Sequence, residues 1–553
     1  MIEKIVPAWG WLRRYERGHL RADLLAGLTV AVMLVPQAMA YAMLAGLPPV
    51  VGLYACVAPL MVYALFGSSR QLAVGPVAII SLLVAAKCSA LAKPGSQEYL
   101  TLVLLLALLV GLAQLALGLL RAGFLLNFLS RAVIAGFTSA AALIICFSQL
   151  KHLLGIPLAQ GDSVFTLAAE AAVRIGQTSP ITLAVGGASI AVLALFRKRW
   201  PRFPSAMTVV ILATLLVWLL RLDTHGVAVV GAVPGGLPGF SPPKLDWHAA
   251  SSLAPTAITI ALVGFLESIA IAQSIAAREK YRVDPNQELR ALGLANVAAG
   301  LFSGYPVTGG FSRTAVSYSA GAKTLLASLV TAAAVVLTLL FLTPLFHYLP
   351  KAVLAAVVIV AVVGLIEVKE GLRLYKVKRA DGVTFLVTFL ATLILDVEPG
   401  VLTGVALSLA LFVWRSSRPH MAELGYVAEE GVFRDLARYP NARTYPNVLI
   451  LRVDASLYFA NARFVEDRLR QRLAERQDVA WVLLDMSAAN DIDATAVSTL
   501  EELIDDYQPR GIGFAFAGMK ARVRDLVARA GWKAKYGKRV EYASLKQALE
   551  DVL

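Results

Sequence analysis

Long apolar segments recur along the first three quarters of this chain, and they constrain its fold more than any other feature. A helical segment of this kind satisfies its own backbone polar groups, which is how a chain crosses the roughly 30 Å apolar layer of a membrane. Hydrophobic residues make up 58% of the 553 residues and charged residues only 16%, a balance too apolar for a soluble protein of this length. About fourteen segments are expected, at residues 22–44, 50–66, 72–87, 99–120, 124–149, 181–196, 205–220, 252–277, 287–303, 311–322, 324–346, 351–366, 382–395 and 399–414. The sequence therefore predicts a polytopic α-helical membrane protein.

Lysine and arginine residues are unevenly distributed among the connecting loops. If residues 1–20 lie in the cytoplasm, counting spans alternately places the larger basic clusters inside, including Arg197-Lys198-Arg199 and the group between Lys369 and Arg379. Because positive charge accumulates on the cytoplasmic side, this asymmetry favours both termini in the cytoplasm. Membrane topology also explains the net charge of +14 better than a nucleic-acid partner does.

The predicted spans divide into two halves of seven, a first repeat over about 21–221 and a second over about 252–418. An odd number of spans in each half forces the two halves into opposite orientations in the membrane. The Gly- and Pro-rich residues 222–253 are expected to connect the halves on the external side. This organisation is typical of carriers built from inverted repeats.

Two of the apolar segments are interrupted, and each is the third of its half. In the second half, Pro306 and the Gly309-Gly310 pair predict a short extended piece followed by a helix that begins near Ser312. In the first half, a strand-like piece and the Gly75-Pro76 break precede a helix that ends near Lys87. Paired interrupted helices at corresponding positions indicate the substrate site of a transporter.

A helix that begins inside the membrane directs unpaired backbone N–H groups and the positive end of its dipole into a cavity, where they attract an anion. Arg313 adds a full positive charge in the second interrupted segment. The alternative is a turn before an ordinary short helix. The residues expected at the anion site are Gly75, Pro76, Val77, Gly310, Phe311, Ser312 and Arg313.

Three further polar residues lie within uninterrupted spans. Glu267 is expected deep in its span, where an ionised carboxylate costs about 2.5–3.5 kcal/mol, so it should face a cavity or a partner. The alternative is a structural carboxylate that pairs with Arg313 or with the backbone. Gln37 can donate its amide to an anion without burying a charge, and Tyr41 should share its face one turn later. For these two residues, helix packing is the competing interpretation.

After Arg418 the segments become short and mixed in character. Strands are expected at 448–453, 481–485 and 513–517, and helices at 462–476, 494–507 and 521–530. This alternation predicts a cytoplasmic α/β domain over residues 447–553, joined to the membrane part by a linker over 419–446. The cysteines and histidines of the chain have no metal-ligand spacing, and no phosphate-binding loop of the Walker type occurs, so no metal, cofactor or ATP-driven step is expected.

Several motifs resemble the sulfate permease (SulP) family of anion transporters, the bacterial relatives of the animal multifunctional anion exchangers. The stretch from Gln37 to Tyr54, QAMAYAMLAGLPPVVGLY, resembles the long signature of that family. The residues NQEL at 286–289, GLAN at 293–296, Ser312-Arg313 and GAKT at 321–324 also match. The C-terminal part resembles a STAS domain (sulfate transporter and anti-sigma-factor antagonist) through LYFANA at 457–462, LDMS at 484–487 and IDAT at 492–495.

The resemblance implies seven-plus-seven inverted repeats, as in uracil permeases, divided into core and gate domains, and usually a homodimer. It places Gln37 and Tyr41 at the anion site and an acidic residue associated with cation coupling at Glu267. We therefore expect a non-enzymatic, proton-coupled symporter that works by an elevator-like movement, with Na⁺ a less favoured coupling ion. Sulfate, a C4-dicarboxylate such as fumarate, and bicarbonate are all possible substrates. The alternative is a passive anion uniporter or channel.

The resemblance also raises a regulatory possibility in the STAS domain. Thr495 falls where soluble anti-sigma antagonists carry a phosphorylated serine, although Ala494 and Ala496 depart from that motif. An ordinary helix N-terminus is therefore the preferred interpretation of Thr495. A cytoplasmic protein partner bound through this domain is a further possibility. A bacterial chain of this kind would lie in the inner membrane.

Overall fold

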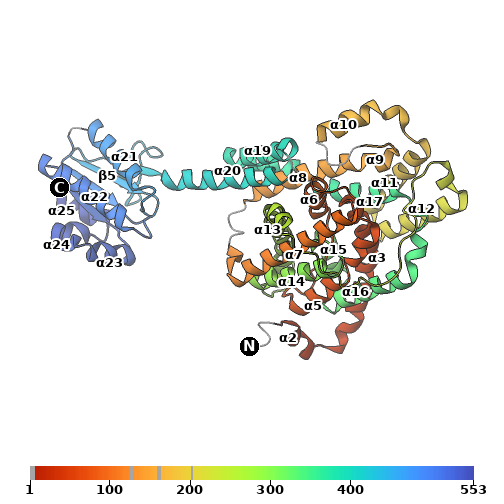
Figure 1. Cartoon of the computed structure of the whole chain (residues 1–553). Coiled ribbons are helices and arrows are strands. Elements are labelled where there is room, and N and C mark those ends of the chain that lie inside the picture. The colour runs from red at the N-terminus through yellow and green to blue at the C-terminus, as the bar shows by residue number, and fades with distance from the viewer. Residues whose placement is uncertain (1–5, 125–129, 159–163, 201–203, 396, 477) are drawn as a thin grey trace. The chain divides into compact units, whose positions relative to one another are not determined.

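The computed structural model describes residues 6–124, 130–158, 164–200, 204–395, 397–476 and 478–553 (Figure 1). The chain forms two compact units, residues 1–408 and residues 409–553. Nine helices in the described part of the chain are long and apolar enough to cross a membrane, and shorter apolar helices lie among them. The prediction of a polytopic α-helical membrane protein is confirmed.

The first half of the membrane unit contains one helix, or one pair of helices, for each predicted segment. The segment expected at 50–66 is divided, because the chain leaves helical geometry between Tyr54 and Ala58, just before Pro59. The helices of this half are α2 (Ala8–Arg13), α3 (Leu20–Leu44), α4 (Pro49–Tyr54), α5 (Ala58–Phe66), α6 (Ala78–Ser89), α7 (Gln97–Leu119), α8 (Arg131–Ser148), α9 (Leu150–Leu154), α10 (Val164–Val173), α11 (Pro180–Arg199) and α12 (Ser205–Leu220).

The second half likewise matches its predicted segments. The segment expected at 324–346 changes character, since its α-helix ends at Leu337 and continues as a π-helical turn and then a 3₁₀ turn that contains Pro344. The helices are α13 (Trp247–Arg278), α14 (Pro285–Leu301), α15 (Phe311–Ser319), α16 (Leu326–Leu337), α17 (Lys351–Val363), α18 (Val368–Val377), α19 (Arg379–Leu395) and α20 (Val397–Ser417).

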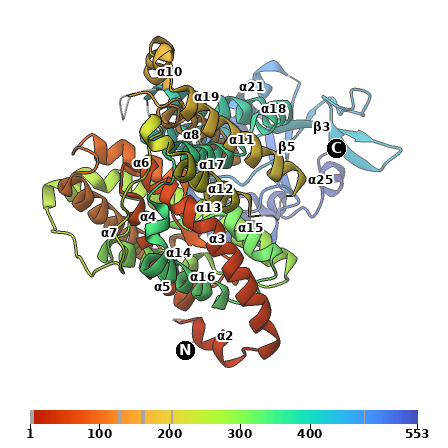
Figure 2. The same cartoon turned by 90° about the vertical axis from the view of Figure 1, so that its right-hand side faces the viewer.

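The helices of the membrane unit pack as two groups. We call α3 to α7 with α13 to α16 the core group, in which α14 packs on α7 and α5, and α16 on α3. We call α8, α11 and α12 with α17 and α19 the gate group, in which α19 packs on α8, and α11 on α17. Helices α3 and α15 of the core group lie side by side (Figure 2). Each group thus combines helices from both halves of the chain, as interleaved repeats require.

Two fully buried carboxylates fasten the core group. Glu288 of α14 accepts hydrogen bonds from the Tyr63 hydroxyl at 2.7 Å and from the backbone N–H groups of Ser68 at 2.7 Å and Ser69 at 3.0 Å. Asp23 of α3 accepts from the backbone N–H groups of Lys323 at 2.7 Å and Thr324 at 3.0 Å. These bonds fix the chain that enters the first interrupted segment and the chain that leaves the second.

The C-terminal unit contains a five-stranded sheet in the order β4-β3-β5-β6-β7. The strands are β3 (Met421–Val427), β4 (Val432–Asp435), β5 (Val448–Val453), β6 (Trp481–Asp485) and β7 (Gly513–Ala517). The last three strands are parallel, and β3 pairs antiparallel with both β4 and β5. The helices are α21 (Ala462–Glu475), α22 (Ala494–Tyr507), α23 (Ala521–Arg529), α24 (Trp532–Tyr536) and α25 (Leu545–Val552).

The central strands of this sheet are buried on both faces. On β6, Val482 and Leu484 belong to the apolar cluster under α21 and α22, whereas Leu483 belongs to the cluster under α25. Alternate residues of a strand point to opposite faces, so a strand covered on both sides is apolar throughout. This continuous pattern is why the expected strands coincide with β5 to β7. The expected helices agree with α21 to α23 to within one residue.

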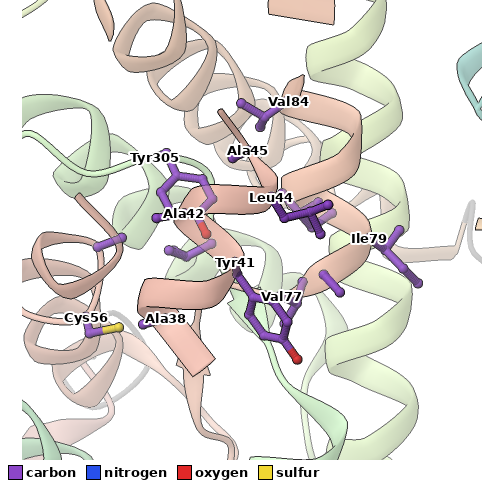
Figure 3. Packing of buried hydrophobic residues seen from close by; sticks show 14 of the residues in the cluster. Ala38, Tyr41, Ala42, Leu44, Ala45, Cys56, Val77, Ile79, Val84 and Tyr305 are labelled. Carbon is purple, nitrogen blue, oxygen red and sulfur yellow. The ribbon is translucent and has the colours of Figure 1, made fainter. Parts of the chain in front are cut away.

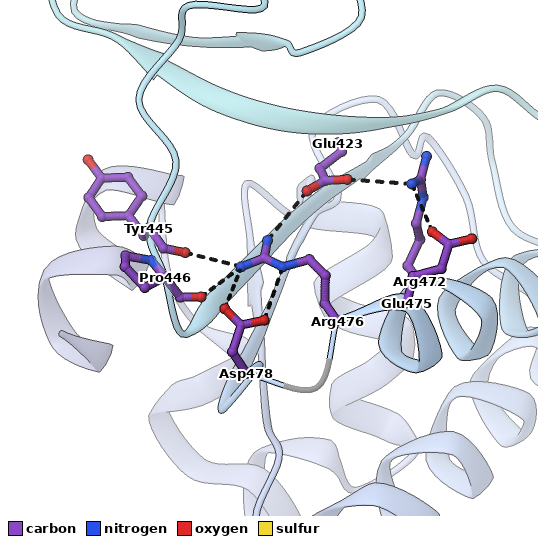
Figure 4. Close-up of polar contacts among 7 residues, drawn as sticks. All are labelled: Glu423, Tyr445, Pro446, Arg472, Glu475, Arg476 and Asp478. Carbon is purple, nitrogen blue, oxygen red and sulfur yellow. Dashed lines mark hydrogen bonds and ion pairs between the residues drawn. The ribbon is translucent and has the colours of Figure 1, made fainter.

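The prediction of a linker over 419–446 is wrong for most of that range, because β3 and β4 belong to the sheet. Arg476, just after α21, donates to the Pro446 carbonyl oxygen at 2.7 Å and lies 3.5 Å from the Glu423 carboxylate (Figure 4). These contacts attach the expected linker to the body of the domain. The hairpin was missed because neither strand has a continuous apolar run or a regular polar–apolar alternation, and no residue of β4 is fully buried.

Candidate functional site

The two interrupted segments meet in space. Residues Val74 and Gly75 (β1) pair antiparallel with Gly309 and Thr308 (β2), and the Gly310 N–H donates to the Ala73 carbonyl oxygen at 3.0 Å. Helix α6 starts three residues after β1 and α15 starts two residues after β2. The predicted start of α15 near Ser312 is correct to within one residue. The paired strands therefore bring two helix N-termini together from opposite halves of the chain.

Neither of these helix N-termini is capped by a side chain. The N-cap residues are Val77 for α6 and Gly310 for α15, and neither supplies a side-chain acceptor. Elsewhere in the membrane unit, Ser96, Ser179 and Asp284 cap α7, α11 and α14 in the usual way. The first-turn N–H groups of α6 and α15 have no partner within their helices, and without caps they remain available to a ligand.

Arg313 joins the two half-helices. Its side chain is only 1% exposed, and its Nη1 donates to the carbonyl oxygen of Pro76 at 2.7 Å. Its Nε and Nη2 atoms are buried and have no hydrogen-bond partner among the described residues. The guanidinium lies over Gly310, where an added Cβ would stand 2.6 Å from the guanidinium carbon. A buried cation with two unused donors is poised for an anion, because an unmet charged donor is costly.

A cavity of about 280 Å³ opens at this point, and we call it the central cavity. It brings together most of the predicted site residues, namely Tyr41, Val77, Glu267, Gly310, Phe311, Ser312 and Arg313. Tyr41 and Val77 lie next to each other within the buried packing of the core group (Figure 3). Of the remaining predicted residues, Gly75 lies in β1 and Pro76 presents its carbonyl oxygen to Arg313, so both support the cavity from behind.

Glu267 faces the central cavity from α13. Its Oε2 atom is buried and has no hydrogen-bond partner among the described residues. The alternative of a structural ion pair with Arg313 is not observed in the part of the chain that the structure describes. Glu267 also lines a second cavity of about 440 Å³, which extends toward α8 and which we call the α8-side cavity. The carboxylate therefore lies where two cavities adjoin.

Gln37 occupies a neighbouring position. Its side chain is 5% exposed, and its Oε1 atom is buried without a partner among the described residues. It lines a third cavity, also of about 280 Å³, which we call the α3-side cavity and which shares Ser312 with the central cavity. Gln37 and Tyr41 thus border adjoining cavities rather than a single one.

Two charged residues on the gate-group side of the site were not predicted from the sequence. Arg197 lines both the central and the α3-side cavities, and Glu367 lines both the central and the α8-side cavities. Arg197 was interpreted only as part of a basic cluster that orients its span. Glu367 follows α17 at the end of an apolar segment. Neither position carries a local motif, because each reaches the site only through the packing of the two groups.

Thr495 of the C-terminal unit lies in the first turn of α22 and is exposed. The helix is capped by Asp493, whose carboxylate accepts from the Ala496 N–H at 2.8 Å. This is the geometry of an ordinary capped helix N-terminus. A phosphorylation site at Thr495 stays a prediction.

Comparisons with known proteins agree with this geometry. Residues 20–388 match the sulfate permease family and residues 439–546 match the STAS domain. Sulfate transporter 4.1, chloroplastic, of Arabidopsis thaliana is 39% identical over 99% of this chain and 82% of its own length. The probable sulfate transporter Rv1739c of Mycobacterium tuberculosis (strain ATCC 25618 / H37Rv) is 38% identical over 100% of this chain and 99% of its own length.

Solved structures extend the likeness to the fold. The murine Slc26a9 anion transporter in the inward-facing state superposes with a TM-score of 0.92 at 26% identity, over 100% of this chain and 94% of that chain. The transmembrane domain of the cyanobacterial bicarbonate transporter BicA has a TM-score of 0.62 at 22% identity, over 71% of this chain and 98% of that chain, and it shows the shared fold alone. The chain belongs to the sulfate permease family of membrane anion transporters and carries a C-terminal STAS domain.

Proposed function

We propose that this protein is a secondary active transporter that takes up a small anion together with a proton. Two uncapped half-helix N-termini meet around Arg313, beside the carboxylate of Glu267, and this pairing carries the proposal. The Nε and Nη2 of Arg313 and the Oε2 of Glu267 have no hydrogen-bond partner among the described residues. An anion receives N–H groups from both helices, the guanidinium of Arg313 and the hydroxyl of Ser312. Each of these donors favours negative charge without fixing the identity of the anion.

Proton coupling follows from the charges that share the central cavity. An ionised Glu267 places a negative charge on the wall of the cavity that receives the anion, and the two negative charges repel each other. A proton on Glu267 removes this repulsion, so binding of the proton and binding of the anion favour each other. We favour H⁺ over Na⁺ as the coupling ion, because a single carboxylate on the moving core group, Glu267, is enough to carry a proton.

Transport requires the site to face each side of the membrane in turn. The anion donors lie on the core group, and the gate group covers the central cavity with residues such as Arg197 and Glu367. An elevator-like movement of the core group along the gate group would carry the anion and the proton together. A passive uniporter or channel is the second candidate, and it has no need for a carboxylate in the cavity.

The named relatives favour sulfate as the substrate, with a C4-dicarboxylate such as fumarate or bicarbonate as the other candidates. We further propose a bacterial inner-membrane location with both termini in the cytoplasm, a homodimer surrounded by lipid, and a STAS domain that offers a surface to a cytoplasmic partner.

Uptake into proteoliposomes tests this function directly. Labelled sulfate, fumarate, bicarbonate and chloride are supplied separately, with and without an inwardly directed proton gradient. We expect one of them to accumulate above its external concentration only when the gradient is present. Downhill anion flux at the same rate with and without the proton gradient would favour the uniporter or channel.

A further inference from the structure

The three cavities at the site carry different charges. Within the described lining, Arg197 is the one ionisable side chain of the α3-side cavity. The α8-side cavity is bordered by Glu267 and Glu367, together with Arg131, whose Nε lies 3.0 Å from the Glu370 carboxylate. The central cavity joins the two and is lined by both carboxylates and by Arg197 and Arg313. The site is therefore more positive toward α3 and more negative toward α8.

Arg197 is an exposed residue that contacts a neighbouring helix of the gate group. It lies in the last turn of α11, and its Nη1 donates to the carbonyl oxygen of Val360 in the last turn of α17. Carbonyl groups in the last turn of a helix lack a donor within the helix and attract basic side chains. Gly364 leaves room for the guanidinium, since a Cβ at that position would overlap Nη2. This bond uses Nη1 and holds the charge of Arg197 at the edge of the central cavity.

We propose that Arg197 is the anion contact of the gate group, and that the site selects doubly charged oxyanions by holding them between Arg197 and Arg313. This assignment rests on the proposed function and narrows its substrate class. The Coulomb attraction to each arginine is twice as large for a dianion as for a monoanion. Guanidinium groups also match the paired oxygen atoms of an oxyanion with their planar, forked donors.

Two other residues place the anion toward Arg197. Ser312 lines both the central and the α3-side cavities, and Gln37 lines the α3-side cavity, where its amide Nε2 supplies N–H donors. The carboxylates of Glu267 and Glu367 repel a dianion toward this same side. The central cavity therefore separates its two ligands, with the anion nearer α3 and the proton nearer α8.

Binding of anions to the purified full-length protein tests the proposal, with the rise in unfolding temperature as readout. Sulfate and thiosulfate serve as dianions, and nitrate and chloride as monoanions, at matched ionic strength. We expect the wild-type protein to bind the dianions more tightly. Arg197→Gln should weaken dianion binding about tenfold or more, as for a lost charged hydrogen bond, and monoanion binding less than about threefold. Glutamine can still donate to Val360, so the contact between α11 and α17 is retained.

Matched variants separate charge from structure. Lys198→Gln removes the adjacent positive charge, which lines none of the described cavities, and should leave all affinities unchanged. Arg197→Lys should keep the preference for dianions. If Arg197→Gln does not fold, Gly364→Ala displaces the guanidinium instead and should weaken dianion binding selectively.

A wild-type protein with no preference for dianions would overturn the proposal. Equal losses for both anion classes in Arg197→Gln, or in Gly364→Ala where that variant replaces it, would also overturn it. Because binding needs no transport, dianion binding through Arg197 without accumulation in vesicles would contradict the proposed function alone.

Discussion

Buried carboxylates occur in two places in the membrane unit, and their hydrogen bonding differs. We call the surroundings of Glu288 and Asp23 the corners of the core group, and we compare them with the central cavity. At the corners, Glu288 and Asp23 are fully buried and accept several hydrogen bonds each. In the cavity, an oxygen atom of Glu267 is buried with no partner among the described residues. Depth in a membrane protein therefore does not by itself identify a functional carboxylate. We base the proposed role of Glu267 on a different feature, a buried carboxylate oxygen beside a cavity with no partner among the described residues.

The largest expected effect is the loss of stability on removing the carboxylate of Glu288. Glu288→Ala leaves the donors of Tyr63, Ser68 and Ser69 without their acceptor. Each buried donor without a partner lowers the free energy of unfolding by on the order of 1–3 kcal/mol. We expect a large fall in the unfolding temperature of the purified protein. Glu267→Ala is the matched control, and it should unfold at or above the wild-type temperature. Equal destabilisation by the two changes would contradict the claim that Glu288 stabilises the fold and Glu267 does not.

The next effect concerns the cation of the cavity. Arg313→Ala removes the buried guanidinium, including Nε and Nη2, which have no partner among the described residues. Hydrogen bonds to charged groups contribute about 1.5–3 kcal/mol. We expect the apparent Kd for the transported anion to rise roughly 10- to 100-fold. Arg290→Ala, which removes an arginine on the core group outside the described cavities, provides the comparison. An Arg313→Ala protein that binds the anion normally would show that the half-helices suffice alone.

A smaller effect is expected at Ser312. Its hydroxyl is a neutral donor, which contributes about 0.5–1.5 kcal/mol, and its backbone N–H remains in Ser312→Ala. The apparent Kd should therefore rise by about 2- to 10-fold, less than in Arg313→Ala. Titration of both variants side by side with the same anion checks this order. An equal loss of affinity in both variants would mean that the charge of Arg313 contributes no more to anion binding than a neutral hydrogen bond does.

Much of this architecture is predictable from sequence where the signal is local. The Gly75-Pro76 break and the pair Pro306 and Gly310 interrupt helices by their own chemistry, and the structure confirms the two half-helices that they predict, α6 and α15. Apolar runs likewise identify the buried strands β5 to β7. The hairpin of β3 and β4 has no such run, and it was mistaken for a linker.

The rest of the site depends on packing between distant segments. Arg197 reaches the cavity because α11 packs on α17, and in the sequence it cannot be distinguished from Lys198 and Arg199. The structural roles of Glu288 and Asp23 depend on hydrogen-bond donors more than two hundred residues distant in the sequence. No local pattern reveals such partners. The residues that the core group contributes to the central cavity were therefore predictable from the sequence, and those that the gate group contributes were not.

The most direct test of the account is gradient-driven anion accumulation by wild type and Glu267→Gln in proteoliposomes, measured at equal protein content. Glutamine keeps the size and polarity of the side chain but cannot exchange a proton. We expect the wild-type protein to accumulate the anion under an inward proton gradient, and Glu267→Gln still to bind the anion but to lose the accumulation. Undiminished gradient-driven accumulation by Glu267→Gln would contradict the role of Glu267 as the proton carrier.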